Sequence, residues 1–122
     1  MNMANEVAIE TTMQTNVGVV AFKSPSMTDV EGIAEATDEI REFVGQNKPR
    51  MLIFDFEQVK FFSSQVLGLL LDIRAKLAAY GGKVVISAIN PQLHRVFRIT
   101  NLDKVFGFFP DRESAVKSAN AE

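Results

Sequence analysis

The sequence predicts an α/β fold built on a mixed, mostly parallel sheet of about five strands with four helices. Apolar runs of strand length alternate with segments whose apolar residues recur every three or four positions, as on one face of a helix. Strands that alternate with helices pair mostly in parallel, through right-handed crossovers. The predicted order is β-β-α-β-α-β-α-β-α. The length of 122 residues predicts a single domain over residues 1–122, with its core at about 6–117.

Two short segments near the amino terminus predict a β-hairpin. Residues 6–11 alternate loosely in polarity, and residues 18–22 form an apolar run that ends before Ser24 and Pro25. The polar residues 14–16 between them are typical of a turn. We expect the first of these strands to add an antiparallel edge to the sheet.

A helix is predicted after the hairpin. Thr28 is followed three residues later by Glu31, which is the spacing of a capping box at a helix start. Gly45, with Pro49 beyond it, predicts the end of this helix. The apolar residues expected on one face are Val30, Ile33, Ile40, Phe43 and Val44, and the acidic residues expected mostly on a solvated face are Asp29, Glu31, Glu35, Asp38, Glu39 and Glu42.

The centre of the chain predicts a buried strand followed by a second helix. Residues 51–56 are almost continuously apolar, which is typical of a strand that is buried on both faces. From Val66 onward the apolar residues recur at helical spacing as far as about Tyr80. Gly81 and Gly82 then predict the stop of the helix.

The carboxyl-terminal third continues the alternation. Residues 84–89 and 105–109 predict two further strands. Between them, Asn90 and Pro91 provide a cap and a first-turn proline for a short helix. A last helix is expected to begin at about Asp111, which completes the four helices of the predicted fold.

The composition argues against several classes of function. The net charge is −2 and the basic residues are scattered, so the sequence predicts no nucleic-acid partner. The absence of cysteine excludes disulfides, thiolate chemistry and cysteine-ligated zinc. No signal peptide is predicted, and the longest apolar stretch, residues 66–71, is far shorter than the ~20 residues of a bilayer span. We therefore expect a cytoplasmic protein without a membrane span.

The chain offers little material for catalysis. His94 is the single histidine, and without a partner for acid–base work it is expected to be a surface or rim residue. No glycine-rich phosphate loop and no paired-histidine metal spacing occurs in the sequence. We expect no enzymatic activity, no cofactor and no metal ion.

Two adjacent serines, Ser63 and Ser64, stand where the apolar stretch 59–62 gives way to the second helix. One interpretation is structural, because a serine hydroxyl that caps a helix stabilises it by about 1 kcal/mol. The other is functional, because the positive end of a helix accommodates a phosphate and presents the serine rigidly to a kinase. Phosphorylation would add roughly 1.5 to 2 negative charges and could prevent a partner from docking without unfolding the domain.

This stretch resembles the signature of STAS domains, a family that includes the anti-sigma factor antagonists, or anti-anti-sigma factors. The resemblance rests on Val59-x-Phe61-Phe62-Ser63-Ser64-x-x-Leu67-Gly68, preceded by Leu52-Ile53-Phe54-Asp55. It covers about residues 18–115 and continues through Gly81-Gly82-Lys83, Asn90-Pro91, Val96-Phe97, Ile99-Thr100, Leu102-Asp103-Lys104 and Phe106.

The family pattern is Asp-Ser-[Ser/Thr]-Gly-Leu-Gly, and its first serine is the phosphorylation site. The resemblance therefore implies that Ser64 is phosphorylated, with Ser63 as the alternative. Ser63 stands where the Asp is usual, Gln65 where the second Ser or Thr is usual, and Val66 where Gly is usual. In the family the Asp helps the phosphotransfer, and a serine cannot supply its charge.

The resemblance implies a bacterial signalling module that regulates transcription by protein contact. Its partners would be a serine kinase that is also an anti-sigma factor, and a phosphatase that resets the switch. The kinase brings ATP and magnesium, so the chain itself needs no cofactor, and we expect a monomer or weak dimer. The residues expected to contact the partner are Phe62, Ser63, Ser64, Gln65, Ser24, Ser26 and Asn90.

Three questions stay open at this point. Phe61 or Phe62 is an exposed anchor, or both are core, because adjacent strand residues point to opposite faces. The departures from the family pattern favour the alternative of a non-phosphorylated scaffold or accessory STAS domain in a stress-sensing or transport complex. The element order also permits a small flavodoxin-like enzyme or nucleotide binder, although the missing phosphate loop counts against it.

Overall fold

The computed structural model describes residues 7–121 and contains seven strands, four α-helices and one 3₁₀ turn among them. In chain order these are β1 (Ile9–Gln14), β2 (Val17–Phe22), β3 (Ser26–Met27), α1 (Val30–Asn47), β4 (Met51–Asp55), β5 (Phe61–Phe62), α2 (Ser64–Ala78), β6 (Lys83–Ser87), α3 (Pro91–Ile99), η2 (Leu102–Lys104), β7 (Gly107–Phe109) and α4 (Arg112–Asn120).

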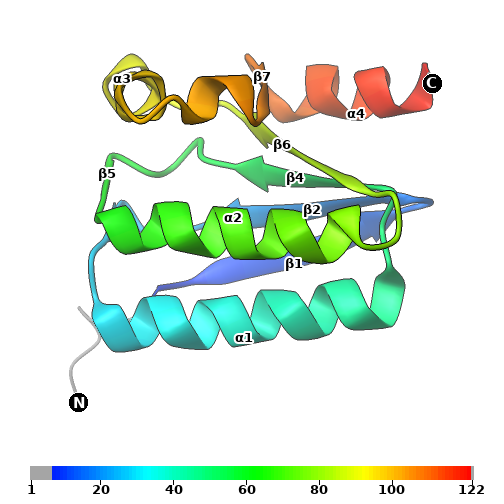
Figure 1. Ribbon diagram of the computed structural model, residues 1–122, viewed down its shortest axis with the longest axis horizontal. Helices are drawn as coiled ribbons and strands as arrows, with labels where there is room; N and C mark the ends of the chain where they lie inside the picture. The colour runs from blue at the N-terminus through cyan, green and yellow to red at the C-terminus, as the bar shows by residue number, and fades with distance from the viewer. Residues whose placement is uncertain (1–6, 122) are drawn as a thin grey trace.

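The main sheet has five strands in the order β1-β2-β4-β6-β7 (Figure 1). β1 pairs with β2 in antiparallel orientation, and the remaining neighbours are parallel. This confirms the predicted fold class, including the antiparallel edge at the amino terminus. The structure adds a separate pair of two-residue parallel strands, β3 with β5, which the sequence did not predict because two residues are too few to show a period.

Helices cover both faces of the sheet, and the alternation of side chains along each strand decides which face a residue serves. Leu52 and Phe54 belong to a large apolar cluster that α1, α2 and α3 share. Met51 and Ile53 point to the other face, into a smaller cluster that Ala115 of α4 completes. Figure 1 shows α1 and α2 side by side along the sheet, with α4 across the sheet from α1.

The first helix starts and ends differently from its prediction. Asp29, not Thr28, is the N-cap residue, and its Oδ2 accepts a hydrogen bond from the Gly32 amide at 2.7 Å. The shift places Val30 at the first helical position, where it is 67% exposed instead of lying on the apolar face. The helix also passes through Gly45 and ends at Asn47, and its C-cap residue Lys48 has a left-handed φ of 41°.

The second helix is displaced toward its amino terminus. α2 begins at Ser64, two residues before the predicted Val66, and its last residue is Ala78. The predicted glycine stop is confirmed: Gly81 has a φ of 88°, and the Gly82 amide donates to the Leu77 carbonyl at 2.8 Å. The predicted cap at Asn90 is confirmed, and α4 begins where it was expected, with the side chain of Asp111 as its N-cap.

Candidate functional site

The two serines lie at the junction of β5 and α2, at the left end of α2 in Figure 1. Ser64 is exposed, as the first residue of α2. Ser63 is half-buried and occupies the N-cap position. Its amide donates to the Met27 carbonyl at 3.0 Å, which ties the junction to β3.

The Ser63 hydroxyl does not cap α2, so the structural interpretation of this residue is not supported. Ser63 has the extended backbone of an N-cap, but no side-chain capping hydrogen bond is formed. Its Oγ is buried and has no hydrogen-bond partner among residues 7–121. A buried hydroxyl without a partner costs free energy. The side chain of Ser63 therefore satisfies none of the free N–H groups in the first turn of α2, and the positive end of the helix dipole is not capped at this position.

Two of the predicted contact residues, Asn90 and Ser24, form hydrogen bonds with the backbone. Asn90 accepts from the Leu93 amide at 2.9 Å and donates through Nδ2 to the Val59 carbonyl at 3.2 Å. Ser24 accepts from the Ala8 amide through its Oγ at 2.8 Å. Both side chains therefore hold backbone segments in place in this structure.

The remaining predicted contact residues, Ser26 and Gln65, lie in β3 and in the first turn of α2. Ser26 is exposed and pairs with Phe61 in the small β3–β5 sheet. Gln65 follows Ser64 in the first turn of α2 and donates to the Val30 carbonyl at 3.1 Å. The start of α1 and the start of α2 are thereby joined at the same end of the molecule.

The structure decides between the two adjacent phenylalanines. Phe62 is only 6% exposed, and its ring packs against Phe56 and Phe97 with centroid separations of 5.9 and 6.1 Å. Phe61 is 58% exposed. The expectation that Phe62 offers a contact surface therefore needs correction: its ring is core, and the exposed ring beside the serines belongs to Phe61.

One partly buried ion pair supports the loop before the serines. Asp55, at the carboxyl end of β4, is 5% exposed, and its Oδ2 accepts from Arg112 Nη2 at 2.7 Å. Its Oδ1 accepts from the Glu57 amide at 3.1 Å. Sequence reasoning used Asp55 only as part of the family resemblance. The sequence did contain a signal for this ion pair, because a carboxylate within an apolar strand is buried and a buried charge needs a partner.

The single histidine of the chain, His94, lies in α3. The ring of His94 is half-buried and packs edge-to-face on Phe108, with a centroid separation of 4.7 Å, which confirms its rim position. No group of three or more His, Asp or Glu side chains in this part of the chain could hold a metal ion. None of its helices is long and apolar enough to cross a bilayer.

A pocket of about 280 Å³ lies at the end of the molecule opposite to the serines. It is lined at the amino ends of the parallel strands by Val17, Met51 and Lys83. Ligands of open parallel α/β sheets bind instead at the carboxyl ends of the strands. The pocket therefore gives no support to a nucleotide site of that kind near Ser64.

Comparisons with known proteins agree on one fold. A family model described as STAS domain matches residues 8–115. The anti-sigma factor antagonist SpoIIAA in its unphosphorylated form has a TM-score of 0.82 and 21% identity, with 94% of this chain and 98% of that chain covered. An anti-sigma factor antagonist from Mycobacterium paratuberculosis has a TM-score of 0.81 and 23% identity, with 97% of each chain covered. The STAS domain of a SulP transporter from Vibrio cholerae has a TM-score of 0.67 and 20% identity, covering 91% and 89%.

Proposed function

Because the chain belongs to the STAS domain family, we propose that it is an anti-sigma factor antagonist-like binding module switched at Ser64. Its partner is a serine kinase that also acts as an anti-sigma factor. The observation that carries this proposal is the exposed Ser64 at the first position of α2. A phosphate there lies at the positive end of a helix and leaves the core untouched.

Ser64 is a better substrate than Ser63 on accessibility alone. The Oγ of Ser63 is buried, so a kinase would have to open the β5–α2 junction to reach it. In the transfer to Ser64, Oγ bonds to the γ-phosphorus of ATP while the bond to ADP breaks. The hydroxyl proton passes to an acceptor that the kinase supplies, because Ser63 provides no carboxylate.

The docking surface is proposed to include two exposed apolar side chains beside Ser64. Phe61 is separated from Ser64 by only two residues, and Val30 is joined to the first turn of α2 through Gln65. Exposed apolar groups near the centre of a contact are typical anchors. Ser26 is exposed on the neighbouring strand and completes this surface.

Gly68 supports close approach of the partner along α2. It is exposed one turn after Ser64, and a Cβ at this position would meet no atom within 4 Å. The fold therefore does not require glycine here, although glycine costs about 1 kcal/mol relative to alanine inside a helix. Glycine at this position leaves a flat helix surface, which would let the backbone of a partner approach α2 closely.

The proposal is tested by incubating the protein with a kinase of this class and ATP and measuring its intact mass. Wild type and Ser63→Ala are expected to gain one phosphate, and Ser64→Ala none. In a titration, Ser64→Asp is expected to bind the kinase at least tenfold more weakly than wild type, with an unchanged unfolding transition. Modification of Ser64→Ala, or unchanged affinity of Ser64→Asp, would contradict the switch.

A second candidate function is a non-phosphorylated scaffold or accessory domain in a stress-sensing or transport complex. The serine in place of the usual acidic residue favours it, and so does the similarity to the STAS domain of a SulP transporter. Light scattering discriminates between the two. A monomer or weak dimer fits the switch, whereas a large homo-assembly, or stable co-purification with a transporter subunit, fits the scaffold. The expected compartment for the switch is the cytoplasm.

A further inference from the structure

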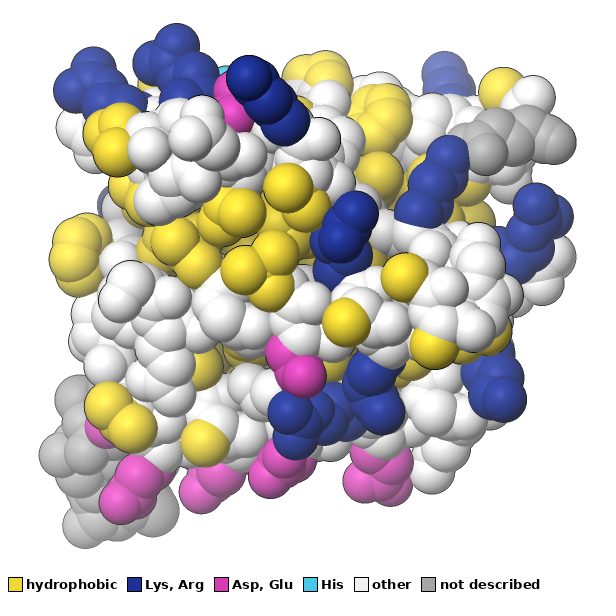
Figure 2. Space-filling view, viewed as in Figure 1, with side chains coloured by type: hydrophobic (Ala, Val, Ile, Leu, Met, Phe, Trp, Pro, Cys, Tyr) yellow, Lys and Arg dark blue, Asp and Glu magenta, His cyan; other side chains and the backbone are white. Residues whose placement is uncertain are grey.

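A strip of apolar side chains lies between α2 and the α3–η2 segment. Ile99 of α3 is 73% exposed and Leu71 of α2 is 39% exposed, which places both among the large apolar side chains that the fold leaves open. Val96 of α3, Leu102 of η2 and Val105 are half-buried and pack against the core. Figure 2 shows hydrophobic side chains gathered over this region. We call these five residues the α2–α3 strip.

The flank of α2 that faces α1 is already occupied. Arg41 of α1 donates to Asp72 of α2 through Nη2 at 2.7 Å, and Gln65 contacts the start of α1 on the same flank. At 100° per residue, Leu71 lies about 100° and Arg74 about 160° around α2 from Asp72, so both are turned away from α1. The strip is therefore not a surface that α1 covers.

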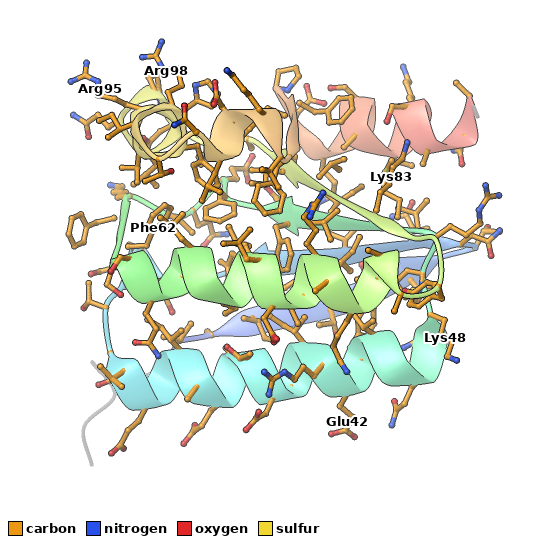
Figure 3. All side chains as sticks on the ribbon, viewed as in Figure 1. Glu42, Lys48, Phe62, Lys83, Arg95 and Arg98 are labelled. Carbon is orange, nitrogen blue, oxygen red and sulfur yellow. The ribbon has the colours of Figure 1, made fainter. Side chains whose placement is uncertain are left out.

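Cations border the strip on both sides. Arg74 follows Leu71 by three residues and Arg95 precedes Ile99 by four, so each exposed aliphatic side chain has a guanidinium one helical turn away. Arg95 and Arg98 extend outward from α3 (Figure 3). These arginines form no ion pair within residues 7–121. Arg74 and Arg95 thus place positive charge beside the strip, although η2 also carries Asp103 and the whole chain has a net charge of −2.

We propose that the α2–α3 strip docks an acidic amphipathic helix of another protein. The apolar face of such a helix covers Leu71 and Ile99, and its flanking carboxylates meet Arg74 and Arg95. This is the helix-in-groove mode of recognition, with charge complementarity fixing the choice of ligand. The proposal goes beyond the kinase switch, because it uses a different flank of α2 and does not require Ser64.

A second copy of this chain is a poorer occupant. Its acidic surface is α1, where Glu35, Glu39 and Glu42 are exposed and Glu42 points away from the sheet (Figure 3). No large apolar side chain lies among these glutamates. The acidic face of α1 could pair with the arginines but would leave Leu71 and Ile99 exposed to solvent. The occupant must therefore provide both carboxylates and an apolar surface.

The probe is a fluorescein-labelled helical peptide with leucine along one face and glutamate on both flanks, and its twin carries lysine at the glutamate positions. Full-length wild type is expected to bind the glutamate peptide at least tenfold more tightly than the lysine peptide, with affinity falling as salt rises. The doubles Leu71→Ser/Ile99→Ser and Arg74→Glu/Arg95→Glu are each expected to weaken binding at least tenfold. Lys76→Glu, which reverses one cation on α2 outside the strip, is expected to change it less than twofold.

Thermal unfolding of each variant separates lost docking from lost folding. Equal binding of the two peptides, or unchanged affinity in both double variants, overturns the proposal. So does a wild-type dimer that Leu71→Ser/Ile99→Ser dissociates, since the occupant is then a second copy. Binding to phosphatidylglycerol vesicles in place of the peptide, lost in the same variants, also overturns it. Ser64→Asp is expected to bind the peptide within threefold of wild type, so this proposal and the kinase switch can fail separately.

Discussion

Arg112, the first residue of α4, donates two hydrogen bonds to one carboxylate oxygen of Asp55, the last residue of β4. The distances to Oδ2 are 3.0 Å from Nε and 2.7 Å from Nη2, across a separation of 57 residues in the chain. The same carboxylate orders the turn at Glu57, from which the chain runs to the serines. The pair therefore fastens α4 to the strand that leads to the candidate site.

Removing the arginine is expected to leave a buried carboxylate without its partner. Arg112→Met should lower the free energy of unfolding by about 2 kcal/mol, at the low end for a buried pair because the arginine is partly exposed. Urea unfolding followed by circular dichroism measures the change. Lys76→Met, an exposed substitution, is expected to stay within about 0.5 kcal/mol of wild type. Equal stabilities of the two variants would show that the pair contributes nothing.

Ser63→Ala is expected to leave the domain as stable as wild type, or to stabilise it. Replacing a serine that caps a helix with alanine typically costs about 1 kcal/mol. Here the hydroxyl is buried, caps nothing and has no partner among the described residues, so its removal relieves a desolvation cost. Urea unfolding compares the two proteins. A loss of about 1 kcal/mol would mean that the hydroxyl does cap α2 in solution.

Gly68→Ala is expected to move stability and binding in opposite directions. Alanine favours the helical backbone, and its methyl group meets no neighbour, so the free energy of unfolding should rise by up to about 1 kcal/mol. The same methyl group should weaken the kinase complex by crowding the surface beside Ser64. Thermal unfolding and a binding titration measure the two effects. Gly45→Ala is the matched control, because this helical glycine also has open space around it; if both variants keep full affinity, Gly68 has no role in docking.

The single tyrosine provides a test of stability at high pH. Burial raises the pKa of Tyr80 above its ordinary value of 10.0. The unfolded chain therefore loses this proton at lower pH than the folded chain does, so the contribution of Tyr80 is present below pH 10 and declines as the pH rises through the folded-state pKa. Because the chain contains one tyrosine, tyrosinate absorbance reports this residue alone. If the tyrosinate titration curves of the folded protein and of the protein unfolded in urea coincide, folding does not raise the pKa of Tyr80.

The sequence alone was sufficient for the alternation of elements and the place of the serines. Strand and helix periods are local properties, so the apolar strand 51–56 and the helix after Ser64 could be recognised without a structure. The side-chain cap at Asn90 also agrees with its prediction, because a cap depends on residues three positions apart. Thr28 and Asp29 are both residues that can cap a helix. The capping-box spacing predicted Thr28, whereas the structure has Asp29 as the N-cap.

Only the tertiary structure decided which of two neighbours is exposed. Pairing of β5 with β3 turns Phe62 into the core and leaves Phe61 outside, and two residues of strand carry no period that could have predicted this. The ion pair between Asp55 and Arg112 joins residues that are distant in the chain. The same is true of the α2–α3 strip, to which Leu71 and Ile99 belong. Local periodicity holds no information on such contacts, because they depend on how the completed elements pack against one another.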